Sequence, residues 1–142
     1  MKTFMLKKNI ARQNWHIFDA KNKILGRFST KLASILKGKN DITYTPHVDS
    51  GNYVIVINSK KIKITGKKLK NKFYYHHTGY SGGIKKISLE NMIKNNSELV
   101  IYKSVKGMLP KGSLGRVMIK KLKIFSGESH NHEAQKPKKL LT

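Results

Sequence analysis

The sequence predicts one α/β domain in which strands and helices alternate along the chain. Two short apolar runs, WHIFDA at residues 15–20 and YVIVIN at residues 53–58, have the length and composition of buried strands. Between them, apolar side chains recur at helical spacing from Leu25 to Leu36. A strand, a helix and a second strand make a β-α-β unit, so we expect a parallel sheet with a helix packed on it.

The first strand and the helix after it have clear ends. The strand at residues 15–20 is followed by the polar KNK, as at a turn. The helix begins near Leu25 and is expected to stop at Gly38, because glycine adopts the left-handed conformation that ends many helices. Residues 53–58 show no polar alternation, which indicates a strand covered on both faces.

The middle of the chain is less regular. Residues 59–65 leave two interpretations open, since Ile62 and Ile64 alternate as in a strand while Ser59 could begin a short helix. The aromatic run KFYYHHT at residues 72–78 is expected to form the third strand.

The rest of the core is predicted to be mainly helical. Ser88 and Ser97 stand where helix N-caps are expected, because a serine oxygen can accept a hydrogen bond from a free N–H group of the first turn. Pro110 and Gly112 separate the second of these helices from the next. The expected elements are helices at residues 88–95, 97–108 and 113–122 and a fourth strand at residues 122–127.

Both ends of the chain are polar and basic, and neither shows sustained periodicity. We interpret residues 1–14 as an N-terminal arm laid along a partner. Residues 129–142 are expected to form a basic C-terminal tail, which leaves residues 15–128 as the core.

The net charge is the strongest functional signal. The chain has 30 Lys and Arg against 7 Asp and Glu, a charge of +23 at pH 7. Because such a charge opposes a compact fold unless an anion lies nearby, we expect a polyanionic partner. Nearly all the cations are lysine, which suits phosphate, whereas arginine is the residue that reads guanine edges. Recognition of backbone and shape is therefore favoured over reading of bases.

The composition also excludes several classes of protein. No cysteine is present, so no disulfide or thiolate metal site can form, which agrees with the reducing cytoplasm. The N-terminal residues lack the apolar core of a secretory signal. No window approaches the roughly 18 consecutive apolar residues of a membrane span, so we expect no membrane partner.

Four of the 6 histidines lie in two clusters, at His76 and His77 and at His130 and His132. Adjacent residues of a strand point to opposite faces, so the first pair cannot readily share one metal ion. The second pair lacks the further ligands that a zinc site requires. The string HNH is merely consecutive, whereas the nucleases of that name need a dispersed set of residues. We expect no metal site.

Two other stretches invite a catalytic interpretation. The stretch GMLPKGSLGR at residues 107–116 departs from the P-loop pattern, because Lys111 precedes the second glycine instead of following it. A helix that starts there still exposes N–H groups that could meet a phosphate. Asp49 lies near His47, but such a pair forms a hydrogen-bonded turn more readily than a catalytic site. We expect no catalytic residues, no cofactor and no small-molecule substrate.

The stretch YYHHTGYSGGIKK at residues 74–86 has the composition of an RNA-contact surface. Tyrosine and histidine rings stack on exposed bases, glycines let the backbone approach a phosphate, and lysines bring charge. Each single tyrosine could instead face the core. The stretch before it, KITGKKLKNK, supplies further lysines, namely Lys63, Lys67, Lys68, Lys70 and Lys72.

Six motifs occur along the chain in the order WHIFDAKNKILGR, YTPHVDSGNYVIVIN, KITGKK, YYHHTGYSGGIKK, VKGMLPKGSLGR and KLKIFSGESHNHEAQ. In this order they resemble the bacterial large-subunit ribosomal protein L-thirteen family, from about Trp15 to Gln135. The resemblance implies a three-layer α/β/α domain with a four-stranded parallel sheet. It also implies a non-enzymatic constituent of the cytoplasmic large ribosomal subunit that binds rRNA, meets neighbouring ribosomal proteins and supports early assembly.

The resemblance further implies which residues face RNA. From the TGKK and YYHHTGY motifs these are Thr65, Gly66, Lys67, Lys68, Tyr75, His76, His77, Thr78, Gly79 and Tyr80, and from the GMLPKGSLGR region Lys106, Lys111, Gly112 and Arg116. Further lysines of the same basic runs complete the expected set: Lys70, Lys72, Lys85, Lys120 and Lys121.

A few positions depart from the family pattern. Ser81 and Asn131 stand where proline is common, and Asn52 stands where aspartate often follows Gly51. We expect these differences to affect only the local shape of the loops.

Two alternative functions remain, a small metal-dependent nuclease and another kind of nucleic-acid-binding protein. Metal-dependent turnover of RNA would favour the first, and a preference for duplex DNA would favour the second.

Overall fold

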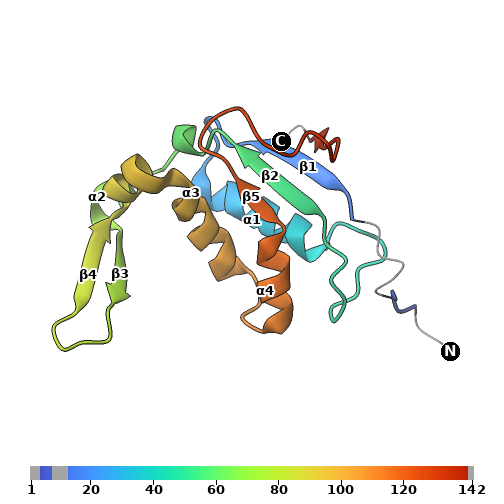
Figure 1. Cartoon of the computed structure of the whole chain (residues 1–142), viewed down its shortest axis with the longest axis horizontal. Coiled ribbons are helices and arrows are strands. Elements are labelled where there is room, and N and C mark those ends of the chain that lie inside the picture. The colour runs from blue at the N-terminus through green and yellow to red at the C-terminus, as the bar shows by residue number, and fades with distance from the viewer. Residues whose placement is uncertain (1–3, 8–12, 141–142) are drawn as a thin grey trace.

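The computed structural model describes residues 4–7 and 13–140 (Figure 1). Strands and helices alternate at first and are then followed by a long helical stretch. The elements are β1 (Trp15–Asp19), α1 (Leu25–Lys37), β2 (Tyr53–Ile57), the 3-10 helix η2 (Ser59–Lys61), α2 (Lys68–Asn71), β3 (Phe73–His77), β4 (Ile84–Ser88), α3 (Leu89–Met108), α4 (Ser113–Lys120), β5 (Leu122–Ile124) and β6 (Lys138–Lys139).

The central sheet has four parallel strands in the order β5-β2-β1-β6. Ile17 of β1 is in register with Ile55 of β2, and Val54 of β2 with Leu122 of β5. The predicted α/β class and the four-stranded parallel sheet are therefore confirmed. The apolar run of β2 is explained as well, because β2 has a strand on either side and Val54, Ile55 and Val56 are fully buried.

The two faces of the sheet are covered differently. Phe18, Val54 and Val56 join the main core with α1, α3 and α4, which lie together below the sheet in Figure 1. On the other face Trp15 stacks on Tyr53, with ring centroids 4.3 Å apart, and the ring of His132 lies 5.3 Å from Trp15. The second outer layer is therefore an irregular C-terminal segment, where a three-layer α/β/α arrangement would place helices.

Helix α1 ends as predicted. Gly38 has φ 77°, and its N–H donates to the carbonyl oxygen of Ile35. The chain then returns close to the helix end, since a Cβ on Gly51 would lie 1.8 Å from the carbonyl oxygen of Leu36. This close approach fixes the start of β2 against α1.

The two helices expected at residues 88–95 and 97–108 are found as one helix, α3, that is interrupted at Asn96 (φ −149°, ψ 80°). The predicted cap at Ser88 is present, with its Oγ accepting from the N–H of Asn91. The predicted cap at Ser97 is wrong. The Oδ1 of Asn96 accepts from the N–H of Leu99 instead, while the buried Ser97 hydroxyl bonds that of Ser59 at 2.7 Å.

The third strand was predicted at the correct place but not in the correct sheet. Residues 73–77 pair antiparallel with residues 84–88 and form a separate two-stranded sheet. Tyr75, His76 and His77 are exposed, so this strand lacks the burial that a strand inside a parallel sheet requires. The fourth position of the parallel sheet is taken by β6, from the segment expected to be a tail. The ambiguous residues 59–65 form the 3-10 helix η2 and then a bridge between Lys63 and Ile24.

Most of the expected N-terminal arm, residues 1–3 and 8–12, lies outside the described residues. Within the described part, Leu6 is buried and its N–H donates to the side-chain oxygen of Thr45 at 3.3 Å. No helix in residues 4–7 and 13–140 is both long enough and apolar enough to cross a membrane.

Candidate nucleic-acid interface

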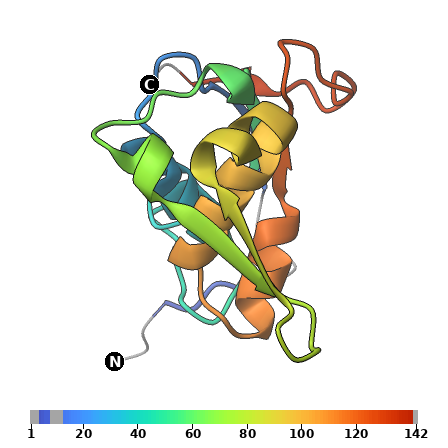
Figure 2. The same ribbon diagram turned by 90° about the vertical axis from the view of Figure 1, so that its left-hand side faces the viewer.

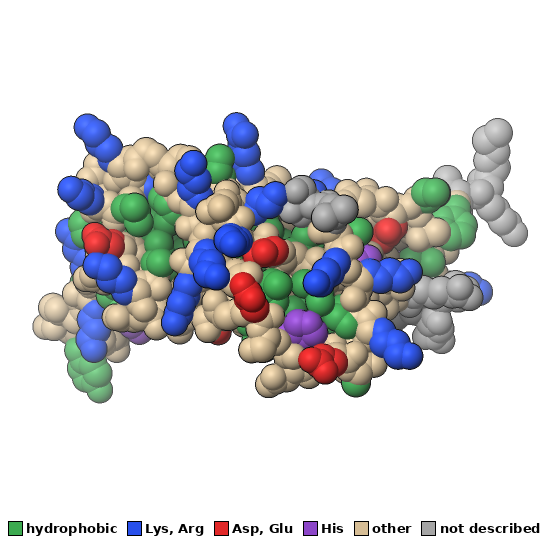
Figure 3. All heavy atoms as spheres, turned by 90° about the horizontal axis from the view of Figure 1, so that it is seen from above, with side chains coloured by type: hydrophobic (Ala, Val, Ile, Leu, Met, Phe, Trp, Pro, Cys, Tyr) green, Lys and Arg blue, Asp and Glu red, His purple; other side chains and the backbone are tan. Residues whose placement is uncertain are grey.

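Few of the positive charges are neutralised within the protein. Among the described residues the ion pairs with carboxylates are Lys61–Glu128, Lys94–Glu90 and Lys121–Asp49. Figure 3 shows Lys and Arg side chains spread over one long face, with acidic side chains at several places among them. The surface is therefore strongly positive, as the composition predicted.

The most prominent basic feature is the hairpin arm, which we define as residues 65–88 and which comprises α2, β3 and β4. Figure 1 shows it projecting from the rest of the molecule, and in Figure 2 it faces the viewer. The expected site residues on the arm are all exposed: Thr65, Gly66, Lys67, Lys68, Lys70, Lys72, Tyr75, His76, His77, Thr78, Gly79, Tyr80 and Lys85.

The strand pairing of the arm places polar and aromatic side chains on both of its faces. Tyr75 lies opposite Lys86 and His77 opposite Ile84, so these pairs share one face. His76 lies opposite Lys85, on the other face. Tyr75 keeps 64% and Ile84 65% of its surface exposed, so both side chains are accessible to a ligand. A ligand can therefore meet rings and ammonium groups from either side.

The tip of the arm is a tight glycine-dependent loop. The N–H of Thr78 donates to the carbonyl of Gly83 at 2.9 Å, and the N–H of Gly83 donates to that of Tyr80 at 3.0 Å. A Cβ on Gly83 would lie 2.0 Å from the Thr78 Oγ1 and 2.8 Å from the carbonyl oxygen of Tyr80, so the loop would have to shift to accept another residue there. Tyr80, 80% exposed, is carried on this loop.

The base of the arm is anchored by Tyr74. Its ring packs against the main core, and the Nζ atoms of Lys72 and Lys103 lie 5.4 and 4.9 Å from the ring centroid. Burial raises the pKa of the Tyr74 hydroxyl. Tyr74 is therefore a structural residue of the interface.

Lys103 of α3 is a cation near the arm that the sequence patterns did not single out. Its position one helical turn before Lys106 is a signal that could have found it.

A second basic group surrounds the turn between α3 and α4. Here Lys106, Lys111 and Arg116 line a groove of about 210 Å³, together with the apolar Leu109, Pro110 and Ile119. Gly112 precedes α4 and supplies no side-chain cap, so the first turn of this helix can offer N–H groups to a phosphate. The remaining expected residues of this group, Gly112 and Lys120, are also exposed. The structure thus places the expected residues in two groups, one on the arm and one at this turn.

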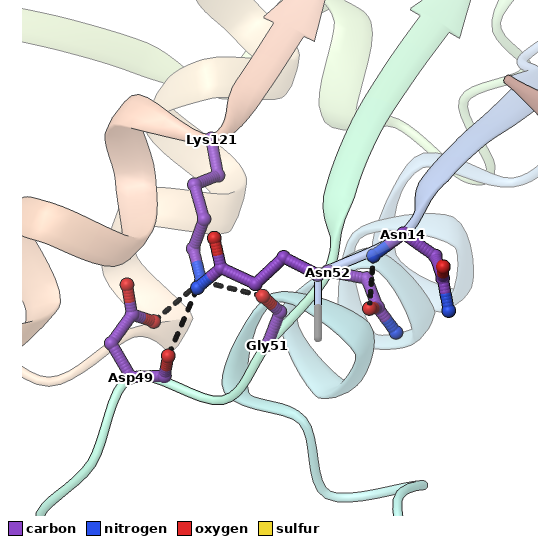
Figure 4. Close-up of polar contacts among 6 residues, drawn as sticks. Asn14, Asp49, Gly51, Asn52 and Lys121 are labelled. Carbon is purple, nitrogen blue, oxygen red and sulfur yellow. Dashed lines mark hydrogen bonds and ion pairs between the residues drawn. The ribbon is translucent and has the colours of Figure 1, made fainter. Parts of the chain in front are cut away.

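Lys121 does not belong to the surface, and its expected RNA contact is wrong. Only 4% of its side chain is exposed. Figure 4 shows its Nζ pointing inward, where it donates to Asp49 Oδ1 at 2.5 Å and to the carbonyl of Gly51 at 2.7 Å. The adjacent Lys120 is exposed, since successive residues at the end of α4 point in different directions.

The histidine clusters take part in turns and ring packing. The Nδ1 of His77 accepts from the N–H of Gly79 at 2.9 Å, and that of His130 accepts from the N–H of His132 at 3.2 Å. The rings of His130 and His132 also lie against Phe125. Within residues 4–7 and 13–140, no three His, Asp or Glu side chains gather in a way that could hold a metal ion.

A family model described as ribosomal protein L13 matches residues 13–131, which include the arm, the turn between α3 and α4, and most of the sheet. The chain belongs to the ribosomal protein L13 family. The resemblance drawn from the six motifs is thereby confirmed.

Close relatives in this family match the chain from end to end. It is 54% identical over 140 residues to the large ribosomal subunit protein uL13 of Baumannia cicadellinicola, with 99% of each chain covered. It is 58% identical over 137 residues to that of Buchnera aphidicola from Schizaphis graminum, with 96% of each covered. To that of Dictyoglomus thermophilum it is 53% identical over 140 residues, with 99% of each covered.

Membership of the ribosomal protein L13 family settles the broad class of the molecule. The chain is a ribosomal protein and not an enzyme, and its place is the ribosome in the cytoplasm. The alternative of a metal-dependent nuclease is therefore excluded.

Proposed function

We propose that this chain is a constituent of the large ribosomal subunit that binds large-subunit rRNA through the hairpin arm and the turn between α3 and α4. The observation that carries the proposal is the exposure of the basic and aromatic residues of the arm, on both faces of a two-stranded sheet that projects from the core. The names of the relatives, which are large-subunit proteins, support the choice of subunit.

The binding mechanism follows from the side chains present. Lysines such as Lys67, Lys68 and Lys111 neutralise phosphates and release counterions. The exposed rings of Tyr75 and Tyr80 offer surfaces on which unpaired bases or sugars can stack. The tight loop at the tip lets the backbone approach a phosphate closely. The expected basic ends, residues 1–14 and 129–142, are part of this proposal as sources of further phosphate contacts, although residues 138–139 also form β6 of the sheet.

A role early in subunit assembly is part of the same proposal. A chain of charge +23 lowers the repulsion between rRNA segments when it binds between them. The arm and the turn between α3 and α4 offer two separate contact regions, so one molecule can hold two RNA segments together. Neighbouring ribosomal proteins would then meet the faces that RNA leaves free.

Salt dependence of binding tests the proposal. The full chain is titrated with a large-subunit rRNA fragment at salt concentrations from about 50 to 200 mM, and the slope of log K against log salt is measured. The variant Lys67→Gln/Lys68→Gln should reduce the slope by about 0.7 to 0.9 for each lost phosphate contact. Lys94→Gln is the matched control, because Lys94 is exposed but paired with Glu90. Equal slopes for both variants, or a flat affinity of the parent chain, would contradict the proposal.

A further inference from the structure

The outer edge of the parallel sheet at β5 has no partner strand within residues 4–7 and 13–140. The carbonyl of Lys121 accepts from the N–H of Val54, and the N–H of Phe125 donates to the carbonyl of Val56, so the backbone groups of these two residues face β2. Because neighbouring residues of a strand alternate, the N–H and C=O groups of Leu122 and Ile124 point the other way. β5 is an edge strand, and in residues 4–7 and 13–140 no further strand pairs with this edge (Figure 2).

A shallow groove of mixed character, which includes Asn96 and Glu98 besides apolar side chains, runs beside this edge. It measures about 310 Å³ and lies between β5 and the second half of α3. Leu122 and Ile124 form its wall on the sheet side, and Leu99 and Tyr102 form its wall on the helix side. Apolar side chains next to unpaired backbone groups are what an added strand requires, since the backbone gives affinity and the pockets receive alternate side chains.

Among the described residues, Glu98 is the charged side chain that lines the groove, while the Nζ of Lys106 lies 5.9 Å from the ring centroid of Tyr102 in its wall. Glu98 is partly exposed. In the described part of the chain Glu98 forms no ion pair, although the chain has 30 Lys and Arg and only 7 Asp and Glu. An unpaired carboxylate repels phosphate and attracts an ammonium or guanidinium group. The carboxylate of Glu98 therefore favours a basic peptide over RNA at this position of the groove.

We propose that the groove beside β5 receives an extended, basic peptide segment from a neighbouring protein of the large subunit. The segment adds to the free edge as a fifth strand, bonds Leu122 and Ile124 through its backbone, and places a Lys or Arg side chain against Glu98. The proposal rests on the place of this chain in the large subunit, but it does not depend on which of its residues contact rRNA. Because β5 has only three residues, the contact is small and belongs to the assembled particle.

Photo-crosslinking in purified large subunits tests this contact. A benzoylphenylalanine replaces Tyr102 in the full chain, subunits that contain it are irradiated, and the products are sequenced by mass spectrometry. The expected product joins position 102 to a lysine- or arginine-containing segment of another large-subunit protein. Crosslinks to rRNA alone, or no crosslink at all, would overturn the proposal.

A second position separates this proposal from the rRNA-binding function. Benzoylphenylalanine at Tyr80, on the tip of the hairpin arm, is expected to crosslink to rRNA. If position 80 fails to reach rRNA while position 102 reaches a basic peptide, the function proposed for the arm is wrong and the edge contact stands. If position 80 reaches rRNA while position 102 reaches no basic peptide, the edge contact is refuted and the function proposed for the arm stands.

The role of Glu98 is tested by the yield of the crosslink at position 102. Glu98→Gln is expected to lower the yield about fivefold, as for the loss of one partly exposed ion pair. Glu98→Asp should retain most of the yield, since it keeps the charge. Glu90→Gln is the control on the same helix, because Glu90 is paired with Lys94 and does not line the groove. An unchanged yield in Glu98→Gln would contradict the proposed charge pairing.

Discussion

The Nζ of Lys121 lies 2.5 Å from the Oδ1 of Asp49, and the two residues are separated by 72 positions in the sequence. Their side chains are only 4% and 14% exposed. The same ammonium group donates to the carbonyl of Gly51, just before β2. The pair therefore joins the end of α4 to the loop that leads into the central strand.

Removal of one partner of this pair should destabilise the fold. Asp49→Ala leaves the ammonium of Lys121 buried without a counter-charge, so we expect a loss of about 3 to 5 kcal/mol in the free energy of unfolding, measured by urea denaturation. Glu90→Ala removes the partner of an exposed pair and should change the free energy little. Equal stability of Asp49→Ala and the parent chain would show that the pair does not hold the loop in place.

Gly115 and Gly107 form a matched pair of helical glycines. A Cβ on Gly115 would lie 1.7 Å from the carbonyl oxygen of Pro110, whereas a Cβ on Gly107 would have no atom within 4 Å. Gly115→Ala should therefore lower the thermal midpoint and disturb the turn between α3 and α4. Gly107→Ala should be neutral or stabilising, by up to about 1 kcal/mol, because alanine is the better helix former. A Gly115→Ala chain as stable as Gly107→Ala would contradict the close packing of α4 on Pro110.

The pKa of His16 should be lower in the folded chain than in the unfolded chain. Burial lowers its pKa, and of the charges nearby Asp41 raises the pKa and Lys138 lowers it. Its buried Nδ1 has no hydrogen-bond partner among the described residues. Because the unfolded state then binds a proton more readily than the folded state, the contribution of His16 to stability is complete above the unfolded pKa, near 6.5, and is lost as the pH falls through the folded pKa.

NMR titration of the His16 ring in the folded chain and in urea measures this shift, with His16→Gln to assign the signal. The expected midpoint is lower in the folded chain. An equal or higher midpoint would show that the ring is solvated or paired with Asp41.

The exposed tyrosines of the arm should matter for RNA and not for folding. Tyr80→Ala and Tyr75→Ala each remove a ring that is mostly exposed, so their unfolding midpoints should stay close to that of the parent chain. If a base stacks on the ring, its removal should weaken the free energy of binding to an rRNA fragment by about 1 to 3 kcal/mol. Tyr44→Ala, which removes a partly exposed ring outside the arm, is the control. Equal affinities for all three variants would contradict stacking on the arm.

The local sequence pattern was sufficient to predict the elements in the first half of the fold. The apolar runs of β1 and β2, the one-sided apolar spacing of α1 and the stop at Gly38 each depend on neighbours within a few residues, so the sequence expresses them directly. The break at Asn96 belongs to the same class, because a capping side chain and its N–H partner are three residues apart.

Contacts between residues far apart in the sequence could not be predicted from local pattern. β6 consists of Lys138 and Lys139, which have no strand character, and it exists because β1 offers a free edge. Lys120 and Lys121 are adjacent residues of the same type, but only Lys121 is buried, because its ammonium group pairs with Asp49. The arm was found from its composition, but its pairing with residues 84–88 was not, because those residues lack a buried alternating face.

Binding of rRNA by the hairpin arm and by the turn between α3 and α4 can be tested by ultraviolet crosslinking of intact large subunits, which locates the peptides of this chain that join to rRNA. We expect crosslinks within residues 65–85 and 106–120, where the exposed cations and rings lie. Residues 40–59 carry no Lys or Arg although they include Tyr44 and Tyr53, so few crosslinks are expected there. Crosslinks concentrated in residues 40–59, with none on the hairpin arm, would show that the arm is not the rRNA-binding surface.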